Sequence, residues 1–462
     1  MVKPFYLFGV EVGVQNAVGA EDYGLYYAMF NFTFLFNVLL DLGINNFQKI
    51  KVAQDAESGM QNMATLLPMK MLLSGLYMVV TILTALIIGF EGDYWFFIGW
   101  LMINHILSVF LLMFRANLAG LHLFRRDSFL SVIDRLLMIV GVGYLLWFGS
   151  EKFEIETFVL LQTAAYAFAI VLALILTPAG KRLILPKVSM PAMVSMAKQT
   201  WPFALLVLLM TAYNKLDGIM LERLADQGTL EAGIYAQAFR ILDAGNSFAF
   251  LYAGLLLPMF ARMLHEGKAL KELYSLVDQA CRLLIIPAGV VCIISLFFGD
   301  WLMHLLYDEH ADESALSLVW LMGSFVFLTS GYVFGTLITA SAEMKALNWI
   351  AIGTVLLNAV LNWMLIPEYG SEGAAFTSFI SLGFMAIAQI LFSYQKFHLS
   401  LKPWLMRAII LWAFALLAVF VASYFNLSPL VSIFFVLGIS VVSFFTFVIN
   451  RSMILDEFRK RM

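Results

Sequence analysis

The sequence contains little charge and almost no cysteine. Only 13% of its 462 residues are Asp, Glu, Lys or Arg, whereas a soluble domain carries about 25%. This excludes a soluble globular fold, because such a fold would lack the charge needed to cover its surface. The two cysteines, Cys281 and Cys292, lie in or beside one apolar stretch without metal-ligand neighbours. They indicate small apolar packing residues and exclude a disulfide framework.

The sequence also lacks the signatures of nucleotide and cofactor chemistry. No glycine-rich phosphate loop follows a strand, so the chain is not expected to hydrolyse ATP. Four histidines within the apolar regions have no ligand-like spacing, and we predict neither a metal site nor a cofactor. They are His105, His265, His304 and His310. No basic soluble domain is present, and we predict no binding of nucleic acid.

Apolar residues make up 62% of the chain and recur in long runs from end to end. A helix that crosses a bilayer needs roughly 17 to 25 apolar residues, whereas a barrel strand alternates over about ten. The continuous runs therefore predict an all-α polytopic membrane protein with about 14 transmembrane helices, each of which satisfies its own backbone in lipid. The predicted spans are residues 4–18, 24–43, 66–90, 94–120, 129–149, 155–177, 200–221, 232–260, 279–306, 314–341, 346–366, 372–395, 404–425 and 428–449.

Basic residues are distributed unevenly between the segments that join the spans. With the amino terminus inside, 21 of the 28 Lys and Arg residues fall in inner segments or at the inner ends of spans, and only Lys152 and Arg223 fall in outer segments. This bias follows the positive-inside rule and predicts that both termini are cytoplasmic. No connecting loop is long enough to form a domain, which favours transport over catalysis.

An internal repeat divides the chain. Residues 21–30 (EDYGLYYAMF) are similar to residues 230–239 (LEAGIYAQAF), with Gly24 and Gly233 at matching positions 209 residues apart. Transporters are commonly built from repeated bundles with the site between them. The same offset makes the first span short, and we expect the natural reading frame to begin upstream of Met1. We predict an N-lobe of six helices over residues 1–180, a cytoplasmic linker over 181–199, a C-lobe of six helices over 200–398, and two extra helices with a cytoplasmic tail over 399–462.

Several short motifs accompany this repeat. They are Lys3-Pro4-Phe5, Val14 to Gly19, Asp22 to Tyr26, Leu40 to Gly43, Asp217 in a Lys-Leu-Asp-Gly setting, and Gly233 to Asp243. Together with the span plan, they resemble the polysaccharide-biosynthesis and O-antigen flippases of the multidrug/oligosaccharidyl-lipid/polysaccharide superfamily. The resemblance implies two lobes around a central cavity that opens alternately to either face, and an undecaprenyl-pyrophosphate-linked oligosaccharide as cargo. It also implies membrane lipids and the polysaccharide polymerase machinery as partners, and a place in the bacterial cytoplasmic (inner) membrane.

Polar side chains within the first half of the spans are candidate site residues. A charged group in hydrocarbon costs about 2.5 to 3.5 kcal/mol on insertion scales, so such groups mark functional or pairing positions. Asn37 shares a helical stripe with Thr33 and Asp41 and is a candidate for lining the cavity. Arg115 is a candidate for contact with pyrophosphate, which a guanidinium matches well. A structural pair between Arg115 and Asp134 is the alternative.

The second half contains further candidates. Lys215, Arg240 and Asn246 are candidates for cargo binding, and Asp217 and Asp243 for ion coupling. Lys215 and Asp217 lie on opposite faces of one helix, because two residues turn a helix by about 200°. Arg240 and Asp243 are three residues apart and can pair with each other. In the functional alternative, the cargo competes for Arg240 and frees Asp243 to take a proton or a sodium ion.

The leading hypothesis is an alternating-access flippase, not an enzyme, that moves a polyprenyl-pyrophosphate-linked oligosaccharide from the inner to the outer leaflet by rocking of the two lobes. A cation-coupled multidrug antiporter of the same fold is the nearest alternative. Such an antiporter needs an acidic cavity for cationic drugs, and the interior basic residues weigh against it. A polytopic glycosyltransferase or ligase is the alternative from another class, although neither an acid cluster nor a large soluble loop is visible in the sequence.

Overall fold

The computed structural model describes residues 2–41, 56–149, 152–177, 190–265, 270–399 and 402–448. Within these ranges all regular structure is helical, which confirms the predicted all-α class. The chain divides into two units of dense internal contact, Met1–Ala236 and Gln237–Met462, named here the N-terminal unit and the C-terminal unit. The predicted lobe boundaries stay a prediction, and most of the predicted linker lies outside the described residues.

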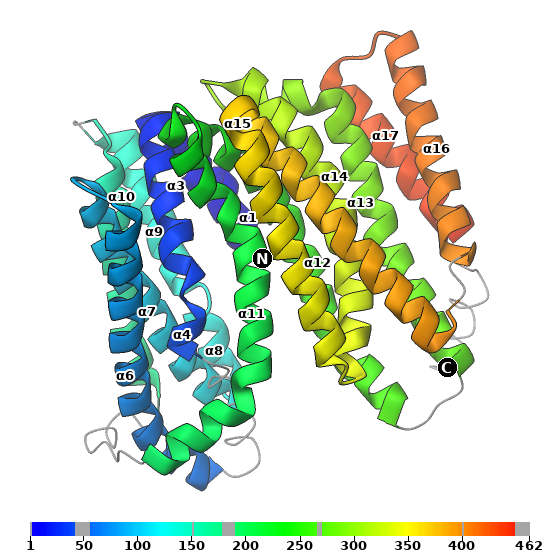
Figure 1. Ribbon diagram of the computed structural model, residues 1–462. Coiled ribbons are helices and arrows are strands. Elements are labelled where there is room, and N and C mark those ends of the chain that lie inside the picture. The colour runs from blue at the N-terminus through cyan, green and yellow to red at the C-terminus, as the bar shows by residue number, and fades with distance from the viewer. Residues whose placement is uncertain are drawn as a thin grey trace. The chain divides into compact units, whose positions relative to one another are not determined.

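The N-terminal unit is a bundle of helices (Figure 1). Its elements are α1 (Val2–Tyr6), the π-helical turn η1 (Leu7–Glu11), α2 (Val12–Val18), α3 (Ala20–Leu35), α4 (Val38–Asp41), α6 (Ala56–Ile88), α7 (Tyr94–Gly120), α8 (Phe124–Leu130), α9 (Ile133–Phe148), α10 (Ile155–Leu176) and α11 (Met190–Leu224). Helix α3 packs along both α7 and α11, and α7 packs along α10.

Helix α12 (Gly228–His265) begins in the N-terminal unit and continues into the C-terminal unit. The remaining elements are α13 (Leu270–Leu306), α14 (Ala311–Ala340), α15 (Met344–Phe397), α16 (Lys402–Tyr424), α17 (Pro429–Ser443) and the π-helical turn η2 (Phe444–Val448). Helix α14 packs along α13 and α15, and α16 packs along α13 and α17.

Ten helices among the described residues are long and apolar enough to cross a membrane. This confirms a multi-pass membrane protein, while the number of fourteen spans stays a prediction. Helix α15 carries two of the predicted spans, and it bends between them at Gly370, whose φ of 50° and ψ of −129° are not helical. Glycine adopts this positive φ without steric cost.

Some helices continue well past the predicted spans. Helix α13 begins at Leu270, whereas the predicted span begins at residue 279. The added turns place Leu273, Leu276 and Val277 in the core of the unit. Their spacing of three and four residues puts them on one helix face, so packing extends the helix beyond its fully apolar part.

Apolar side chains cover the outer faces of the helices. Among the most exposed large hydrophobic residues are Ile87, Val140, Trp147, Ile175 and Phe420. Soluble monomers rarely expose so large a continuous apolar surface. Polar side chains lie inside instead, and in α15 the amide of Asn362 donates to Asn358 Oδ1 at 3.2 Å. This pattern is typical of helices that face lipid and pack through polar contacts.

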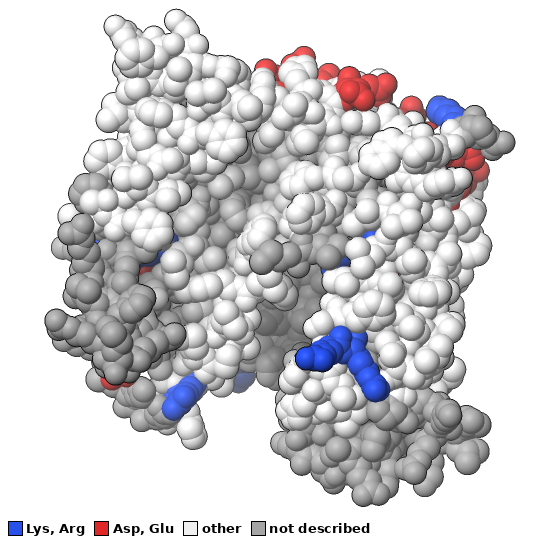
Figure 2. Space-filling model, turned by 180° about the vertical axis from the view of Figure 1, so that it is seen from behind, with Lys and Arg blue, Asp and Glu red and all other residues white. Residues whose placement is uncertain are grey.

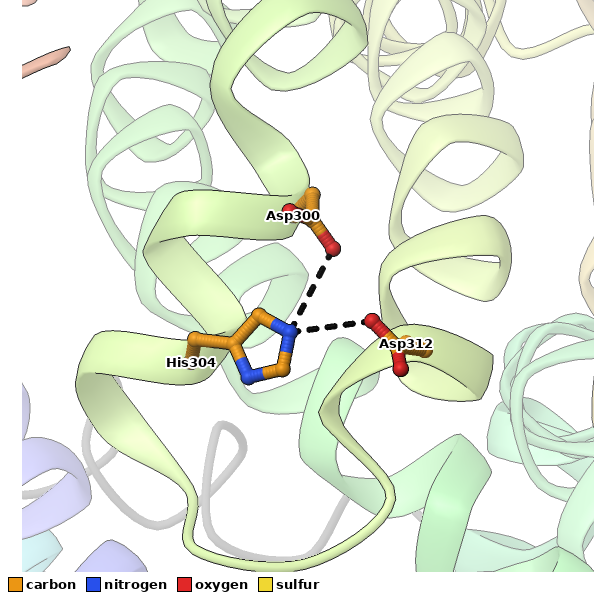
Figure 3. Close-up of side chains that lie close together, drawn as sticks. All are labelled: Asp300, His304 and Asp312. Atoms are coloured by element: carbon orange, nitrogen blue, oxygen red, sulfur yellow. Dashed lines mark hydrogen bonds and ion pairs between the residues drawn. The ribbon is translucent and has the colours of Figure 1, made fainter.

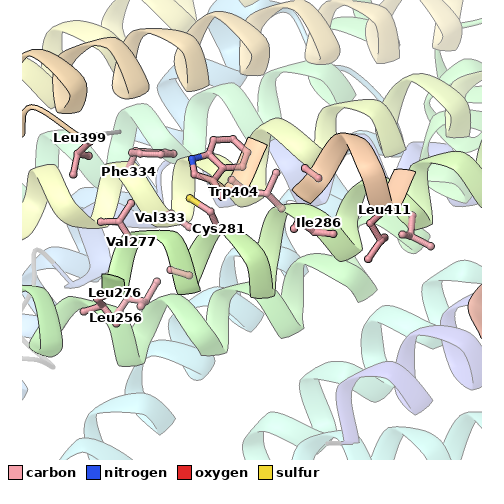
Figure 4. Close-up of a cluster of buried hydrophobic side chains, with 14 of the residues drawn as sticks. Leu256, Leu276, Val277, Cys281, Ile286, Val333, Phe334, Leu399, Trp404 and Leu411 are labelled. Carbon is pink, nitrogen blue, oxygen red and sulfur yellow. The ribbon is translucent and has the colours of Figure 1, made fainter. Parts of the chain in front are cut away.

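The core of the C-terminal unit joins α12, α13, α14 and α16 (Figure 4). Cys281 is fully buried in this core, which confirms its reading as a small apolar residue. Trp412 of α16 donates its indole N–H to the carbonyl of Ile286 at 2.9 Å. Gly289 leaves the space that the indole occupies, since a Cβ there would lie 2.2 Å from it. Helix α16 is thereby fixed against α13.

Charge is concentrated near helix ends. On the face seen in Figure 2, most of the visible carboxylate side chains lie along the upper edge, and most of the visible Lys and Arg side chains lie in the lower half. In the N-terminal unit, the exposed Glu91 and Asp93 precede α7, and the exposed Arg125 and Arg126 follow its other end. A separation of this kind is typical of membrane proteins. Which end is cytoplasmic stays a prediction from the sequence.

Candidate functional site

The N-terminal unit brings a cation and two aromatic rings together on facing helices. Nζ of Lys215 in α11 lies 5.5 Å from the ring centroid of Phe30 and 5.3 Å from that of Phe34, both in α3. The two rings are one helical turn apart, and their centroids lie 5.7 Å from each other. Ring faces attract an ammonium group within about 6 Å. The two rings therefore stabilise the ammonium group of Lys215.

His105 of α7 borders the same rings. Its ring centroid lies 5.2 Å from that of Phe30 and 5.4 Å from that of Phe34. Thr33 donates its single hydroxyl hydrogen to the Met29 carbonyl at 2.8 Å. His105 Nε2 lies 3.1 Å from the same hydroxyl oxygen, and the two side chains share a hydrogen bond. We call this set the Lys215 cluster, and its members are Phe30, Thr33, Phe34, His105 and Lys215.

A network of amides and hydroxyls holds α3, α7 and α10 together beside this cluster. Gln162 donates to the Tyr26 hydroxyl at 3.0 Å, and Thr163 donates to Asn104 Oδ1 at 2.7 Å. The Tyr26 ring lies 6.0 Å from Phe30 between centroids. Hydrogen bonds between helices are a main source of rigidity in lipid. The network therefore fixes the face of α3 that carries the two phenyl rings.

Glu11 is a buried acid that our reading of the sequence did not single out. Its carboxylate accepts a hydrogen bond from the Tyr23 hydroxyl at 3.1 Å. Four residues later, Gln15 donates its amide to the Gly233 carbonyl at 2.9 Å. A carboxylate inside the first apolar span was the signal that could have revealed it, because such groups are costly in the membrane.

Asp217 has other partners than Lys215. Its fully buried carboxylate accepts a hydrogen bond from the Tyr235 hydroxyl at 2.8 Å. The following residue, Gly218, faces Asn31, whose side-chain nitrogen would lie 2.3 Å from a Cβ at that position. Lys215 and Asp217 thus contact different elements, as the rotation of two residues along a helix requires.

The matching glycines of the repeat meet in the N-terminal unit. A Cβ on Gly24 would lie 1.8 Å from the carbonyl oxygen of Thr229, and a Cβ on Gly233 would lie 1.8 Å from that of Ala20. Ala20 and Thr229 are also 209 residues apart, so each repeat contributes the same two positions to the contact. Only glycine permits two backbones to approach so closely. The start of α3 and the start of α12 therefore cross as a pseudo-symmetric pair.

Arg115 forms its close ion pair with Asp127 and not with Asp134. Its Nε lies 2.9 Å from Asp127 Oδ1, and the two side chains are 28% and 23% exposed. After α7 the chain turns at His122, which has a φ of 57°, and α8 then brings Asp127 back towards Arg115. Asp134 also interacts electrostatically with Arg115, but the close ion pair of Arg115 is the one with Asp127. Contact between Arg115 and the cargo stays a prediction.

Asn37 lies in a turn between α3 and α4. Its backbone N–H donates to the Phe34 carbonyl at 3.0 Å. Its Oδ1 is buried and has no hydrogen-bond partner within the part of the chain that the structure describes. The continuous stripe predicted with Thr33 and Asp41 is broken here, and Asp41 instead forms an ion pair with Lys70 at 2.7 Å. Buried amide oxygens nearly always accept a hydrogen bond, so we expect the donor to this one to lie outside the described residues.

The candidates of the C-terminal unit lie on α12. Asn246 Oδ1 accepts a hydrogen bond from the Tyr332 hydroxyl of α14 at 2.6 Å. The backbone carbonyl of Asp243 accepts one from Ser247 at 2.8 Å. Arg240 is buried. The structure thus joins Asn246 to α14, while the predicted pairing of Arg240 with Asp243 and the roles of both stay predictions.

The fold defines the class of the protein. It is similar to a lipid II flippase, MurJ, in an inward closed conformation, with a TM-score of 0.66, 12% identity and 95% of each chain covered. It is also similar to an inward-facing multidrug resistance MATE family transporter of the MOP superfamily, with a TM-score of 0.65, 15% identity, and coverage of 85% of this chain and 94% of that one. A MOP superfamily transporter from Pyrococcus furiosus matches with a TM-score of 0.60, 16% identity, and coverage of 86% and 92%. The chain therefore has the fold of the MOP superfamily.

The sequence defines the family within that class. Residues 8–264 match the family described as polysaccharide biosynthesis protein. This match covers more than half of the chain, and the protein belongs to that family. The capsular polysaccharide biosynthesis protein CapF of Staphylococcus aureus is 28% identical over 178 residues, which are 38% of this chain and 44% of CapF. The match thus spans less than half the length of this curated relative. The predicted polysaccharide-biosynthesis family is confirmed, and the protein is a multi-pass membrane protein with the fold of these transporters.

Proposed function

We propose that the protein is an alternating-access flippase for polysaccharide or O-antigen export. Its cargo is an oligosaccharide linked to a polyprenyl pyrophosphate, which it moves from the inner to the outer leaflet of the bacterial cytoplasmic membrane. The family match and the fold support a flippase. The excess of basic residues in one set of connecting segments supports cytoplasmic termini.

The observation that carries the choice of cargo is the Lys215 cluster. An ammonium group at the level of the spans attracts the phosphate oxygens of a pyrophosphate, and the attraction is strong where water is scarce. Aromatic faces offer apolar surface on which sugar rings stack, and Phe30 and Phe34 present two such faces beside the cation. The His105 imidazole adds a polar group at the same place. A cationic and aromatic site suits an anionic glycolipid better than a cationic drug.

The other candidates have supporting roles in this proposal. Asn37 has a buried amide oxygen that a sugar hydroxyl would satisfy. Arg115, Arg240 and Asn246 are further contacts for the cargo. Asp217 is buried against a tyrosine hydroxyl, and we assign to it and to Asp243 the coupling of transport to a proton or a sodium ion.

The glycine crossing supports alternating access. Gly24 and Gly233 stand at equivalent positions of the two repeats and contact each other's helices. Rocking of repeats against each other changes the distance between equivalent helices. At this crossing the backbones of α3 and α12 touch directly, so few side-chain hydrogen bonds have to break when the two helices separate.

Transport by purified protein in proteoliposomes tests the proposal. The vesicles contain a fluorescent undecaprenyl-pyrophosphate-linked oligosaccharide, and dithionite, which does not cross the membrane, quenches the label in the outer leaflet. We expect the protein to make nearly all of the label accessible, whereas protein-free vesicles keep the inner share protected. Protection equal to that of protein-free vesicles, together with gradient-driven uptake of a cationic dye, would support the multidrug antiporter instead. A change in the mass of the lipid-linked sugar would support an enzyme.

A further inference from the structure

A separate group of potential metal ligands lies where α13 meets α14 (Figure 3). Asp300 and His304 are one turn apart on α13, and Asp312 lies in the first turn of α14. Nε2 of His304 lies 3.6 Å from Asp300 Oδ1 and 2.9 Å from Asp312 Oδ1. One ligand atom from each residue falls within 4.8 Å of the other two. The imidazole nitrogen therefore points between two carboxylates from different helices.

This donor set suits a particular class of ion. One imidazole and two carboxylates are ligands that Zn²⁺ and similar transition metals accept, whereas Ca²⁺ and Mg²⁺ prefer oxygen alone. Ligand atoms about 2.1 Å from a tetrahedral ion lie about 3.4 Å from one another. The side chains of His304, Asp300 and Asp312 are 52%, 70% and 80% exposed. They are free to make the small rotations that this geometry requires.

The backbone that carries these ligands is firmly held. The short connection between the helices contains Tyr307, whose buried hydroxyl donates to the Gln237 carbonyl at 3.3 Å. The amide of Gln237 donates in turn to the Glu309 carbonyl at 3.1 Å. These bonds tie the connection to α12 and fix the separation of α13 from α14. A site on rigid elements needs little reorganisation to bind an ion.

The surrounding charge favours a cation. No Lys or Arg occurs between Arg282 and Lys345. Five acidic residues occur in the same part of the chain between positions 300 and 313, namely Asp300, Asp308, Glu309, Asp312 and Glu313. Such a one-sided field raises the local concentration of cations. Acidic loops are common without a bound ion, but here the histidine adds a donor that a merely solvated loop does not need.

We propose that Asp300, His304 and Asp312 bind a divalent transition-metal ion of the Zn²⁺ type. The ion joins α13 to α14 through three protein ligands and keeps one position for water. The spacing of the histidines relative to one another does not indicate this site, because its other two ligands are carboxylates. The spacing of four residues between Asp300 and His304 places them on one helix face, but Asp312 joins them only through the turn between the helices.

Zinc titration of the purified full-length protein tests the site independently of transport. The protein carries no affinity tag, is stripped with a chelator, and is titrated with Zn²⁺ in a calorimeter. We expect saturable binding at one site that excess Mg²⁺ does not displace. Zn²⁺ should also raise the melting temperature of the protein, since it binds the folded state.

Two variants and a control make the test specific. His304→Ala and Asp312→Asn should each weaken Zn²⁺ binding by about tenfold or more, because even second-shell partners of a metal ligand contribute 10- to 100-fold. Both side chains are exposed, so folding should be preserved, as size-exclusion chromatography will show. His310→Asn is the matched control, because it removes a histidine of the same connection and asparagine tolerates its φ of 55°. Absence of saturable binding to the unaltered protein, or equal binding by His304→Ala, would overturn the proposal.

Discussion

Basic side chains have different kinds of partner in two regions of the N-terminal unit. In the regions around α4 and α8, Lys70 pairs with Asp41 at 2.7 Å and Arg115 pairs with Asp127 at 2.9 Å. In the Lys215 cluster the ammonium lies over two phenyl rings. A carboxylate partner ties a cation to another part of the fold, whereas ring faces attract a cation and also offer apolar surface beside it. The kind of side chain around a cation in a membrane span, and not the depth of the cation alone, therefore helps to distinguish a structural role from cargo binding.

The ion pairs join elements that follow one another in the fold. The Lys70–Asp41 pair ties α6 to α4, and the Arg115–Asp127 pair ties α7 to α8. Lys215 and the phenyl rings come from α11 and α3, which are far apart in the sequence. We therefore expect substitution of the paired cations to affect folding first, and substitution of Lys215 to affect transport first.

The largest expected effect belongs to Lys70→Ala. Removing one partner of a buried ion pair costs about 3–5 kcal/mol, and we expect the lower end because Asp41 is 29% exposed while Lys70 is 1% exposed. The melting temperature in detergent should fall clearly. The double variant Asp41→Ala with Lys70→Ala should recover part of the loss, because no unpaired carboxylate remains. An unchanged melting temperature in Lys70→Ala would show that this ion pair does not stabilise the fold.

Lys215→Met should leave the melting temperature unchanged and slow transport. The methionine keeps the stem in contact with the rings, and its sulfur packs well against them. The lost charge-assisted contact with the cargo is expected to cost about 1.5–3 kcal/mol, or roughly 10- to 150-fold in rate. Export of polysaccharide by cells that depend on the variant gives the measurement. Lys215→Arg should retain most of the activity. Export at the normal rate by Lys215→Met would show that the Lys215 cluster does not bind the cargo.

Gly24→Ala should destabilise the crossing of α3 with α12. Its Cβ would lie 1.8 Å from a backbone oxygen, and overpacking of this kind costs about 1–3 kcal/mol. Gly233→Ala should have the same effect, because its contact is equivalent. Gly75→Ala is the control, since a Cβ there meets nothing within 4 Å and should be neutral or slightly stabilising. The melting temperatures of the three variants test this prediction, and equal values would show that the crossing is not tight.

The smallest effect is expected for Arg115→Ala. Its ion pair with Asp127 is partly exposed, and such pairs contribute about 0–1 kcal/mol. Both the melting temperature and the transport rate should stay close to those of the unaltered protein. A loss of transport as large as that of Lys215→Met would show that Arg115 contacts the cargo despite its carboxylate partner. That result would show that a cation paired with a carboxylate can also bind cargo.

Much of the fold follows from local pattern in the sequence. Apolar runs of bilayer length predict the long helices, and the matching glycines at positions 24 and 233 predict a repeat that the structure brings into contact. These features depend on composition and periodicity along one segment. The break at Asn37 does not, because the surrounding residues are all compatible with a continuous helix.

The partners of the polar side chains were not predictable in the same way. Phe30 and Lys215 are 185 residues apart, and only the packing of α3 against α11 brings them together. Asp127 and not Asp134 forms the close ion pair with Arg115 because of one tight turn. Periodicity shows which residues share a face of a helix, but it does not show which helix lies opposite that face.

The most direct test of the proposed site compares two cargos in two proteins. Proteoliposomes containing the unaltered protein or Lys215→Met receive the same labelled oligosaccharide on the same polyprenyl chain, linked either through pyrophosphate or through a neutral glycosidic bond. If Lys215 holds the anionic linkage, the substitution will slow transport of the pyrophosphate-linked cargo by about tenfold or more and will leave that of the neutral cargo nearly unchanged. Equal slowing of both cargos, or of neither, would contradict the assignment of the Lys215 cluster as the site that recognises the pyrophosphate.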